Sequence, residues 1–346
     1  MTTPLQAIFL GITTALFSYL GVAGVQRWAE RRHLLDIPNE RSSHVHPTPR
    51  GGGLVIVILS TVGIVFAWLR NPTAAPAALI AYLMGAGLIA AVSWLDDLRS
   101  MPNRLRFAAH SLGAILVLLG IGYWGIVNLP LLGAVPLGWL GLIITFVWIV
   151  GLTNAYNFMD GIDGIAGGQA VVAGMGWAAL GYLTDQPLIG LMGILLAAAS
   201  LGFLGHNWPP ARIFMGDVGS AFLGFTFAAL AVAAAQRDAR LALAGILFVW
   251  PFVFDATFTF LRRLKNGENV FAAHRSHLYQ RLVIVGYSHR FVTLLYMSLA
   301  VWGVICGLIW SGGVVGSGAV IVVTLPVLCL ALWASVKRRE RPAESV

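Results

Sequence analysis

The chain has 346 residues, of which 58% are hydrophobic and only 10% charged, and its formal net charge is +8. Soluble domains carry roughly 25% charged residues, so this composition excludes a water-soluble enzyme, and it equally excludes a disulfide scaffold and a disordered chain. We therefore predict an all-α, polytopic membrane helix bundle that forms one domain over residues 1–346.

The hydrophobic runs predict eleven membrane-spanning helices, since a span needs about 20 mostly apolar residues. In chain order they cover residues 5–25, 51–69, 76–95, 105–123, 134–153, 164–183, 187–205, 218–235, 241–261, 291–311 and 314–335. With the C-terminus in the cytoplasm, this odd number places the N-terminus outside. Nineteen of the 22 Lys and Arg residues then fall on cytoplasmic segments, and the outer segments keep only Arg70, Arg237 and Arg240. This distribution follows the positive-inside rule and supports both the count and the orientation.

The first cytoplasmic connection contains DIPNERSSHVHPTPRGGG, residues 36–53. Its basic and titratable side chains include Arg41, His44, His46 and Arg50. The proline-rich run that ends in three glycines is expected to form a turn whose exposed N–H groups bind an anion. A plain turn into the membrane is the alternative.

Two adjacent carboxylates, Asp96 and Asp97, lie at the inner end of the third predicted span. Neighbouring carboxylates at a membrane interface repel each other and lose hydration. They therefore indicate a site that supplies a cation or a reacting proton. A solvated helix end that pairs with Arg99 or Arg104 is the alternative.

Two further acidic motifs follow. In NAYNFMDGIDG, residues 154–164, Asp160 and Asp163 are three residues apart. A helical turn would place them on one face, which Asn157 would join. In FMGDVGS, residues 214–220, Asp217 stands between glycines at the start of an apolar span. A polar turn and a helix N-cap are the alternatives for these motifs.

The longest connection, residues 262–290, contains His274, Arg275 and His277. The two His residues are three apart and would share a helical face. Guanidinium and imidazole groups suit phosphate oxygens, whereas a zinc site would need soft ligands that this loop lacks. A basic loop that binds anionic lipid headgroups is the alternative. With the carboxylate and amide oxygens of the other motifs, which suit Mg²⁺, the pattern predicts phosphoryl transfer at the cytoplasmic face.

These motifs, in this order, resemble those of the polyprenyl-phosphate N-acetylhexosamine-1-phosphate transferases (glycosyltransferase family 4) over residues 34–281. The resemblance implies that an N-acetyl amino sugar 1-phosphate passes from a UDP-sugar to undecaprenyl phosphate and that UMP leaves. It also implies a multi-pass protein of the bacterial inner membrane that depends on Mg²⁺, with Mn²⁺ as a substitute. We expect membrane lipids but no nucleic acid as partners, and we also consider a homodimer.

The resemblance also implies residue roles, by motif match. Asp217 and Asn157 are expected to bind the metal ion. Asp96 and Asp97 are expected to be catalytic. The residues expected to bind substrate are Asp160, Asp163, His274, Arg275 and His277. Arg104 or Arg106 is expected to make a further contact with phosphate. The active site is then expected to be formed by cytoplasmic loops at about residues 26–50, 96–104, 154–163, 206–217 and 262–290.

The last motif departs from one branch of this family. The phospho-MurNAc-pentapeptide transferase has three consecutive His residues where this chain has His–Arg–Ser–His, residues 274–277. We therefore expect an enzyme that initiates O-antigen (lipopolysaccharide) or a related surface polysaccharide, and that takes N-acetylglucosamine, N-acetylfucosamine or N-acetylquinovosamine. Direct attack by the lipid phosphate and a phospho-enzyme route both remain open.

Two alternatives to this function are retained. One is the pentapeptide transferase of peptidoglycan synthesis. The other, from a different class, is a polytopic secondary transporter. The gathering of carboxylates at one interface counts against the transporter, since transporters place such groups near the middle of the membrane.

Overall fold

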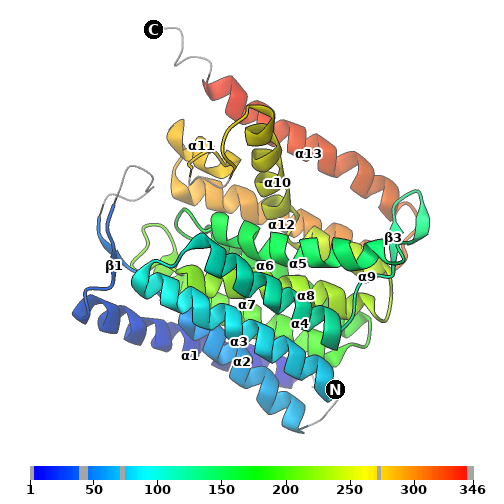
Figure 1. Ribbon diagram of the computed structural model, residues 1–346, viewed down its shortest axis with the longest axis horizontal. Helices are drawn as coiled ribbons and strands as arrows, with labels where there is room; N and C mark the ends of the chain where they lie inside the picture. Colours follow the sequence, from blue (N-terminus) through cyan, green and yellow to red (C-terminus); the bar gives the residue numbers. More distant parts are fainter. Residues whose placement is uncertain (1–3, 39–45, 71–74, 271–273, 341–346) are drawn as a thin grey trace.

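The computed structural model describes residues 4–38, 46–70, 75–270 and 274–340 (Figure 1). Its helices are α1 (Pro4–Arg31), α2 (Gly53–Arg70), α3 (Pro76–Arg99), α4 (Asn103–Gly120), α5 (Leu140–Phe158), α6 (Ile165–Leu183), α7 (Pro187–Asn207), α8 (Asp217–Ala235), α9 (Arg240–Phe248), α10 (Trp250–Lys265), α11 (Leu278–Ile284), α12 (His289–Ser311) and α13 (Ser317–Glu340). Residues 39–45 of the first loop, with Arg41 and His44, lie outside the described residues.

The eleven runs expected to span the membrane each overlap one helix or, for residues 241–261, a bent pair of helices. Among the described residues, eight helices are long and apolar enough to cross a membrane, or nine if α9 and α10 count as one span. Helices α4 and α6 fall outside this set, because α4 carries Arg104 and Arg106 and α6 is rich in glycine and contains Gln169. The prediction of a polytopic helical membrane protein is confirmed.

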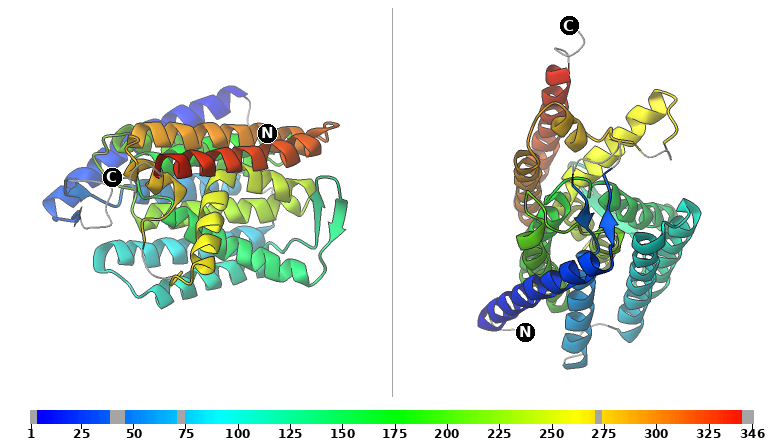
Figure 2. Two further views of the ribbon diagram at one scale, coloured as in Figure 1. Left: turned by 90° about the horizontal axis from the view of Figure 1, so that it is seen from above. Right: turned by 90° about the vertical axis from the view of Figure 1, so that its left-hand side faces the viewer.

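The expected span 241–261 is not one straight helix. Helix α9 ends at Phe248, α10 begins at Trp250, and the two meet at 78°. Pro251 occupies the first turn of α10, where its missing N–H is tolerated, but it cannot extend the hydrogen bonds of α9. The bend turns α10 across the direction of the other helices and away from the bundle (Figure 2).

Two short hairpins add strands to a fold that we predicted to be all-α. Strands β1 (Leu35–Asp36) and β2 (Thr48–Pro49) pair antiparallel, as do β3 (Ile126–Leu129) and β4 (Gly133–Pro136). The prediction that a helix begins at residue 134 is therefore wrong. Residues 134–136 belong to β4, and a turn with Gly138 at φ 55° delays α5 until Leu140.

The long helices lie side by side, with β1 and α11 at one end of the bundle and β3 at the other (Figure 1). The first turn of α1 lies toward the β3 end, and the last turn of α13 lies toward α11. Glycines allow close packing inside the bundle: a Cβ on Gly193 of α7 would lie 2.3 Å from the backbone nitrogen of Ala178 in α6. Helix α8 is almost entirely buried, which fixes the position of its first residue, Asp217.

Candidate active site

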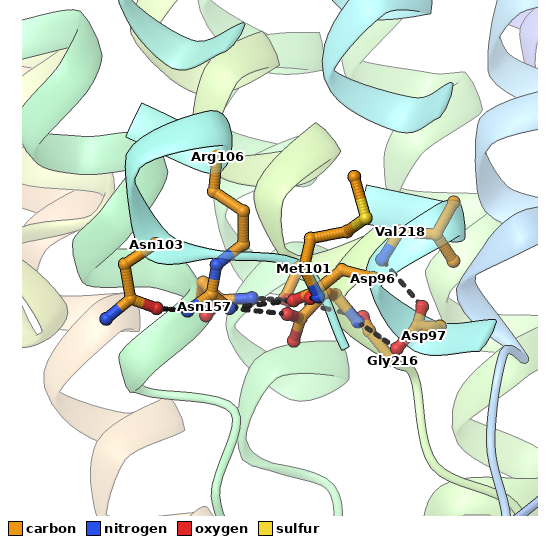
Figure 3. A network of polar contacts seen from close by, with 10 residues as sticks. Asp96, Asp97, Met101, Asn103, Arg106, Asn157, Gly216 and Val218 are labelled. Carbon is orange, nitrogen blue, oxygen red and sulfur yellow. Dashed lines mark hydrogen bonds and ion pairs between the residues drawn. The ribbon is translucent and has the colours of Figure 1, made fainter. Parts of the chain in front are cut away.

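The first turn of α8 is held by a carboxylate from another helix. Asp97, near the end of α3, accepts hydrogen bonds from the backbone N–H of Asp217 and of Val218, both at 3.0 Å (Figure 3). Asp97 is only 2% exposed. The preceding residue must be glycine, since φ is 77° at Gly216 and a Cβ there would lie 2.6 Å from the Asp97 carboxylate. The Asp97 side chain thus caps the N-terminus of α8, although Asp97 lies far from α8 in the sequence.

Arg106, in the first turn of α4, lies between two carboxylates. Its Nη1 atom donates to Asp96 Oδ2 at 2.8 Å and to Asp217 Oδ2 at 3.1 Å, and its Nη2 atom donates to Asn103 (Figure 3). The backbone N–H of Met101 also donates to Asp96. The Asp217 side chain remains 32% exposed, against 9% for Asp96. One positive group therefore bridges two carboxylates at a position that solvent and a substrate can reach.

Two residues of the 154–164 motif extend this cluster. Asn157, in the last turn of α5, donates to Ser220 Oγ at 3.0 Å and also contacts the Asp217 carboxylate. Asp160 follows α5 and is half-buried. Burial, together with the negative charges of Asp217, Asp97 and Asp163, raises the pKa of Asp160 to about 8. The four carboxylates therefore interact electrostatically. As a result, Asp160 retains its proton at neutral pH when no cation is bound.

The glycine-rich end of the first loop packs on the FMGDVGS segment. The N–H groups of Gly52 and Gly53 donate to the carbonyls of Phe214 and Met215 at 3.0 and 2.9 Å. A Cβ on Gly53 would lie 2.4 Å from the Cα of Gly219. The expectation that these N–H groups would bind an anion is wrong for both, because they are already used in backbone pairing.

The turn after α5 is not helical, so Asp160 and Asp163 do not share a helix face as we expected. Gly164 has φ 79° and begins α6, and its N–H donates to Asn207 Oδ1 at 2.9 Å. The Asp163 carboxylate accepts from the backbone N–H of Ala211 at 3.1 Å and pairs with His289 Nδ1 at 3.3 Å. Asp163 thus joins this turn to the loop before α8 and to the start of α12.

The expected helical face of His274 and His277 is also absent. His274 precedes the helix, and His277 is the N-cap residue of α11, in an extended conformation. Their rings nevertheless lie close, with centroids 5.1 Å apart, and His274 Nδ1 lies 2.9 Å from Ser276 Oγ. Burial lowers the pKa of His274 to about 4, and the nearby positive charges of Arg263 and Arg262 act in the same direction. His274 is therefore neutral at pH 7.

Tyr279 of α11 connects this histidine segment to the acidic turn. Its hydroxyl donates to the carbonyl of Phe158 at 2.9 Å. A Cβ on Gly161 would lie 2.1 Å from the same hydroxyl oxygen, so glycine is required there. Our sequence reasoning missed Tyr279, although its place two residues after His277 was visible in the motif.

The residues predicted to form the site are thus found in two adjoining groups at one end of the bundle. Asp96, Asp97, Arg106, Asn157 and Asp217 form a direct network, which Asp160 adjoins. His274 and His277 reach the same region through Tyr279 and the turn after α5. Arg275 is half-buried. Of the two arginines left open, only Arg106 contacts the cluster, while Arg104 is exposed on the same helix turn.

The oxygen atoms of this cluster fit a magnesium ion. Among the described residues, no group of three or more His, Cys, Asp or Glu side chains is arranged to hold a metal alone. Mg²⁺, however, is usually held by one or two carboxylates together with substrate phosphates. Asp96 and Asp217 already share one cationic group, Arg106, and Asn157 adds an amide beside Asp217. The arrangement can bind a divalent cation jointly with a diphosphate.

Comparisons with known proteins give a consistent picture. A family model described as glycosyl transferase family 4 matches residues 79–235. The probable undecaprenyl-phosphate N-acetylglucosaminyl 1-phosphate transferase of Bacillus subtilis is 32% identical over 78% of this chain and 75% of that protein. The decaprenyl-phosphate N-acetylglucosaminephosphotransferase of Mycobacterium tuberculosis is 33% identical over 84% of this chain and 80% of its own length. The phospho-N-acetylmuramoyl-pentapeptide-transferase of Latilactobacillus sakei is 29% identical over 71% of this chain and 79% of that protein.

Proposed function

Since the chain belongs to glycosyl transferase family 4, we propose that it transfers N-acetylglucosamine 1-phosphate from UDP-N-acetylglucosamine to undecaprenyl phosphate. The products are UMP and a lipid-linked diphosphate sugar. The observation that carries the proposal is the cluster in which Arg106 bridges Asp96 and Asp217, because such a cluster suits a diphosphate and a divalent cation. Two relatives that match 78% and 84% of this chain are both named for N-acetylglucosamine.

Mg²⁺ is the cofactor in this proposal, and Mn²⁺ its substitute. Asp217 and Asn157 would hold the ion, with Asp96 beside them. When bound, the ion would neutralise charge that develops on the leaving phosphate. Two observations support this assignment. The proposed ligands are hard oxygen atoms, and the Asp217 side chain is 32% exposed.

The chain's own residues would position the reactants. Arg106 would bind phosphate oxygens when the substrate replaces its carboxylate partners. His274, Arg275 and His277 would hold the donor diphosphate, and Asp160 and Asp163 would order the nucleotide side of the site. We favour direct transfer: a lipid phosphate oxygen bonds to the β-phosphorus of the donor while the bond from that phosphorus to the UMP oxygen breaks. Asp96 and Asp97 would orient this attack rather than form a phospho-enzyme.

We further propose that the protein crosses the bacterial inner membrane eleven times, with the N-terminus outside and the site on the cytoplasmic face. The placement of 19 of 22 basic residues on one side supports this topology. So does the position of the first turn of α1 and the last turn of α13 at opposite ends of the bundle (Figure 1). The site loops lie at the end where α13 finishes in Lys337, Arg338 and Arg339.

A supply of lipid-linked sugar for O-antigen or a related surface polysaccharide is the cellular role that we favour. The His–Arg–Ser–His sequence at residues 274–277 distinguishes the chain from the pentapeptide transferases, and the relative of that type from Latilactobacillus sakei matches a smaller share of this chain, 71% against 78% and 84%. A transporter has no support from the family to which the chain belongs.

A panel of donors tests the proposal. Purified protein, undecaprenyl phosphate and Mg²⁺ are incubated separately with UDP-N-acetylglucosamine, UDP-N-acetylfucosamine, UDP-N-acetylquinovosamine and UDP-MurNAc-pentapeptide, and UMP release is measured. Release with UDP-N-acetylglucosamine that also requires the lipid supports the proposal. Release with the pentapeptide donor alone, or with none of the four, would overturn it.

A further inference from the structure

Asp255 is a buried carboxylate outside the acidic cluster. It lies in α10 and is 0% exposed. Its Oδ1 atom accepts from the N–H of Leu278 at 2.9 Å and from the Thr259 hydroxyl at 3.2 Å, and its Oδ2 atom accepts from the N–H of Tyr279 at 3.0 Å and the Tyr296 hydroxyl at 2.5 Å. A buried carboxylate is costly unless it is hydrogen-bonded, and these four donors offset the cost of burying Asp255.

The same carboxylate fixes the ring of His277. His277 Nδ1 lies 3.2 Å from Asp255 Oδ1, and the His277 side chain is only 5% exposed. A carboxylate that accepts backbone N–H groups can only accept here as well, so Nδ1 carries the hydrogen. In the imidazolium form Nε2 also carries a hydrogen, which it can donate to a phosphate oxygen. The rings of His274 and Tyr279 on either side, at 5.1 and 5.8 Å, further restrict its rotation.

Asp255 also sets where the histidine segment lies relative to the acidic cluster. By binding the N–H of Tyr279, it places that side chain so that the hydroxyl reaches the Phe158 carbonyl beside the Asp160 turn. Asp255 therefore connects α10, α11 and α12 to the end of α5. A change at Asp255 would reach the substrate only through His277 and α11, since Asp255 itself is enclosed.

We propose that Asp255 is a positioning residue for the transfer reaction, which holds His277 with its Nδ1–H bound so that the Nε2–H of the imidazolium form is directed at the donor phosphates. The inference rests on the proposed function, in which His277 contacts the donor diphosphate. Removal of the groups that orient metal-ligating imidazoles commonly costs about 10- to 100-fold in affinity or activity, and we expect an effect of that size for the imidazole of His277. The loss should appear in the kinetic constants for the donor and not in those for the acceptor, because α11 does not bind the acceptor phosphate in this proposal.

The test is a double-mutant cycle on full-length protein, with UDP-N-acetylglucosamine as donor, undecaprenyl phosphate as acceptor and Mg²⁺ present. We expect Asp255→Asn to lower kcat/KM for the donor about 10- to 100-fold, through a higher donor KM, while the acceptor KM stays unchanged. His277→Ala should cause a similar loss, and the double variant should be no worse than His277→Ala alone. Tyr296→Phe is the matched control: it removes one hydrogen bond to Asp255 without touching His277, and its effect should be below about threefold and additive with His277→Ala.

Additive losses for Asp255→Asn and His277→Ala, or a loss in kcat alone with both KM values unchanged, would overturn the positioning role. If Asp255→Asn does not fold, a comparison of two His277 variants still tests the positioning role. An Asn amide can replace the Nδ1–H that Asp255 binds, whereas a Gln amide reaches the Nε2 position. We expect His277→Gln to retain more transfer than His277→Asn, and the reverse order contradicts the inference. Absence of transfer by the unaltered protein would instead refute the proposed function.

Discussion

Asp97 caps the helix that Asp217 begins: the Asp97 carboxylate accepts the backbone N–H of Asp217 at 3.0 Å, although the two residues are 120 positions apart. The paired aspartates of α3 therefore differ. Asp96 faces Arg106, whereas both oxygens of Asp97 are used by the first turn of α8.

Asp97→Asn is predicted to cut turnover sharply and to destabilise the protein by about 1–3 kcal/mol, because one buried N–H of α8 loses its acceptor. Donor binding should be largely intact. Thermal unfolding in detergent and the transfer assay measure the two effects. A variant with normal turnover and a normal melting temperature would contradict both the capping role and the catalytic one.

Asp217→Ala is predicted to abolish transfer at every Mg²⁺ concentration. The substitution removes the more exposed of the two carboxylates that Arg106 bridges, and with it the principal oxygen ligand in our proposal. UMP release during a Mg²⁺ titration is the measurement. Recovery of activity at high Mg²⁺ would show that other ligands suffice.

Arg106→Gln is predicted to lower kcat/KM for the donor by at least about tenfold, since a charge-assisted contact to phosphate is lost. Arg104→Gln is the matched comparison on the same helix turn, and it should lose much less because Arg104 is exposed. Equal losses in both variants would mean that charge near the membrane, rather than contact with the cluster, is what matters.

The raised pKa of Asp160 predicts a pH-dependent requirement for Mg²⁺. Below about pH 8 this carboxyl keeps its proton, and a cation bound at Asp217 would favour the charged form of Asp160, so that cation binding is coupled to loss of the proton. The Mg²⁺ concentration for half-maximal transfer should therefore fall as pH rises from 7 toward 8.5. Asp160→Asn should weaken this dependence, and an unchanged dependence in that variant would assign it to another group.

Gly161→Ala is predicted to lower both transfer and stability, because its new methyl group would lie 2.1 Å from the Tyr279 hydroxyl oxygen. Tyr279→Phe removes that oxygen and leaves the nearest ring carbon 3.2 Å away. The double variant should therefore be more active than Gly161→Ala alone. If it is not, the turn tolerates the methyl group by another movement and the steric explanation fails.

The helices themselves were predictable from the sequence, since long apolar runs have few other folds in a membrane. The bend at Pro251 and the hairpin at residues 126–136 were not, because their signals, single prolines and glycines, lie inside apolar segments. The run of glycines at residues 51–53 was misinterpreted for a related reason. A glycine signals close approach, but only the fold shows that the approaching group is Gly219 and not an anion.

The acidic motifs pointed to one site, yet their spacing misled about local geometry. Asp160 and Asp163 are separated by a turn. The Asp163 carboxylate accepts a hydrogen bond from the backbone N–H of Ala211 and pairs with His289. Spacing of three residues implies a shared face only where a helix exists. Asp255 lacked a sequence signal for its role, since its partners come from α11 and α12, which follow it by 22 to 41 residues.

The contact between Gly53 and Gly219 has a mechanical consequence. Where α2 and α8 begin, the backbones of Gly53 and Gly219 meet directly, and the Met215 side chain packs beside both glycines. This flank of the acidic cluster is thus held rigidly, because α2 cannot slide along it without breaking the pairing of Gly52 and Gly53 to residues 214 and 215. Any movement that widens the proposed site for a substrate is therefore expected in elements other than the starts of α2 and α8.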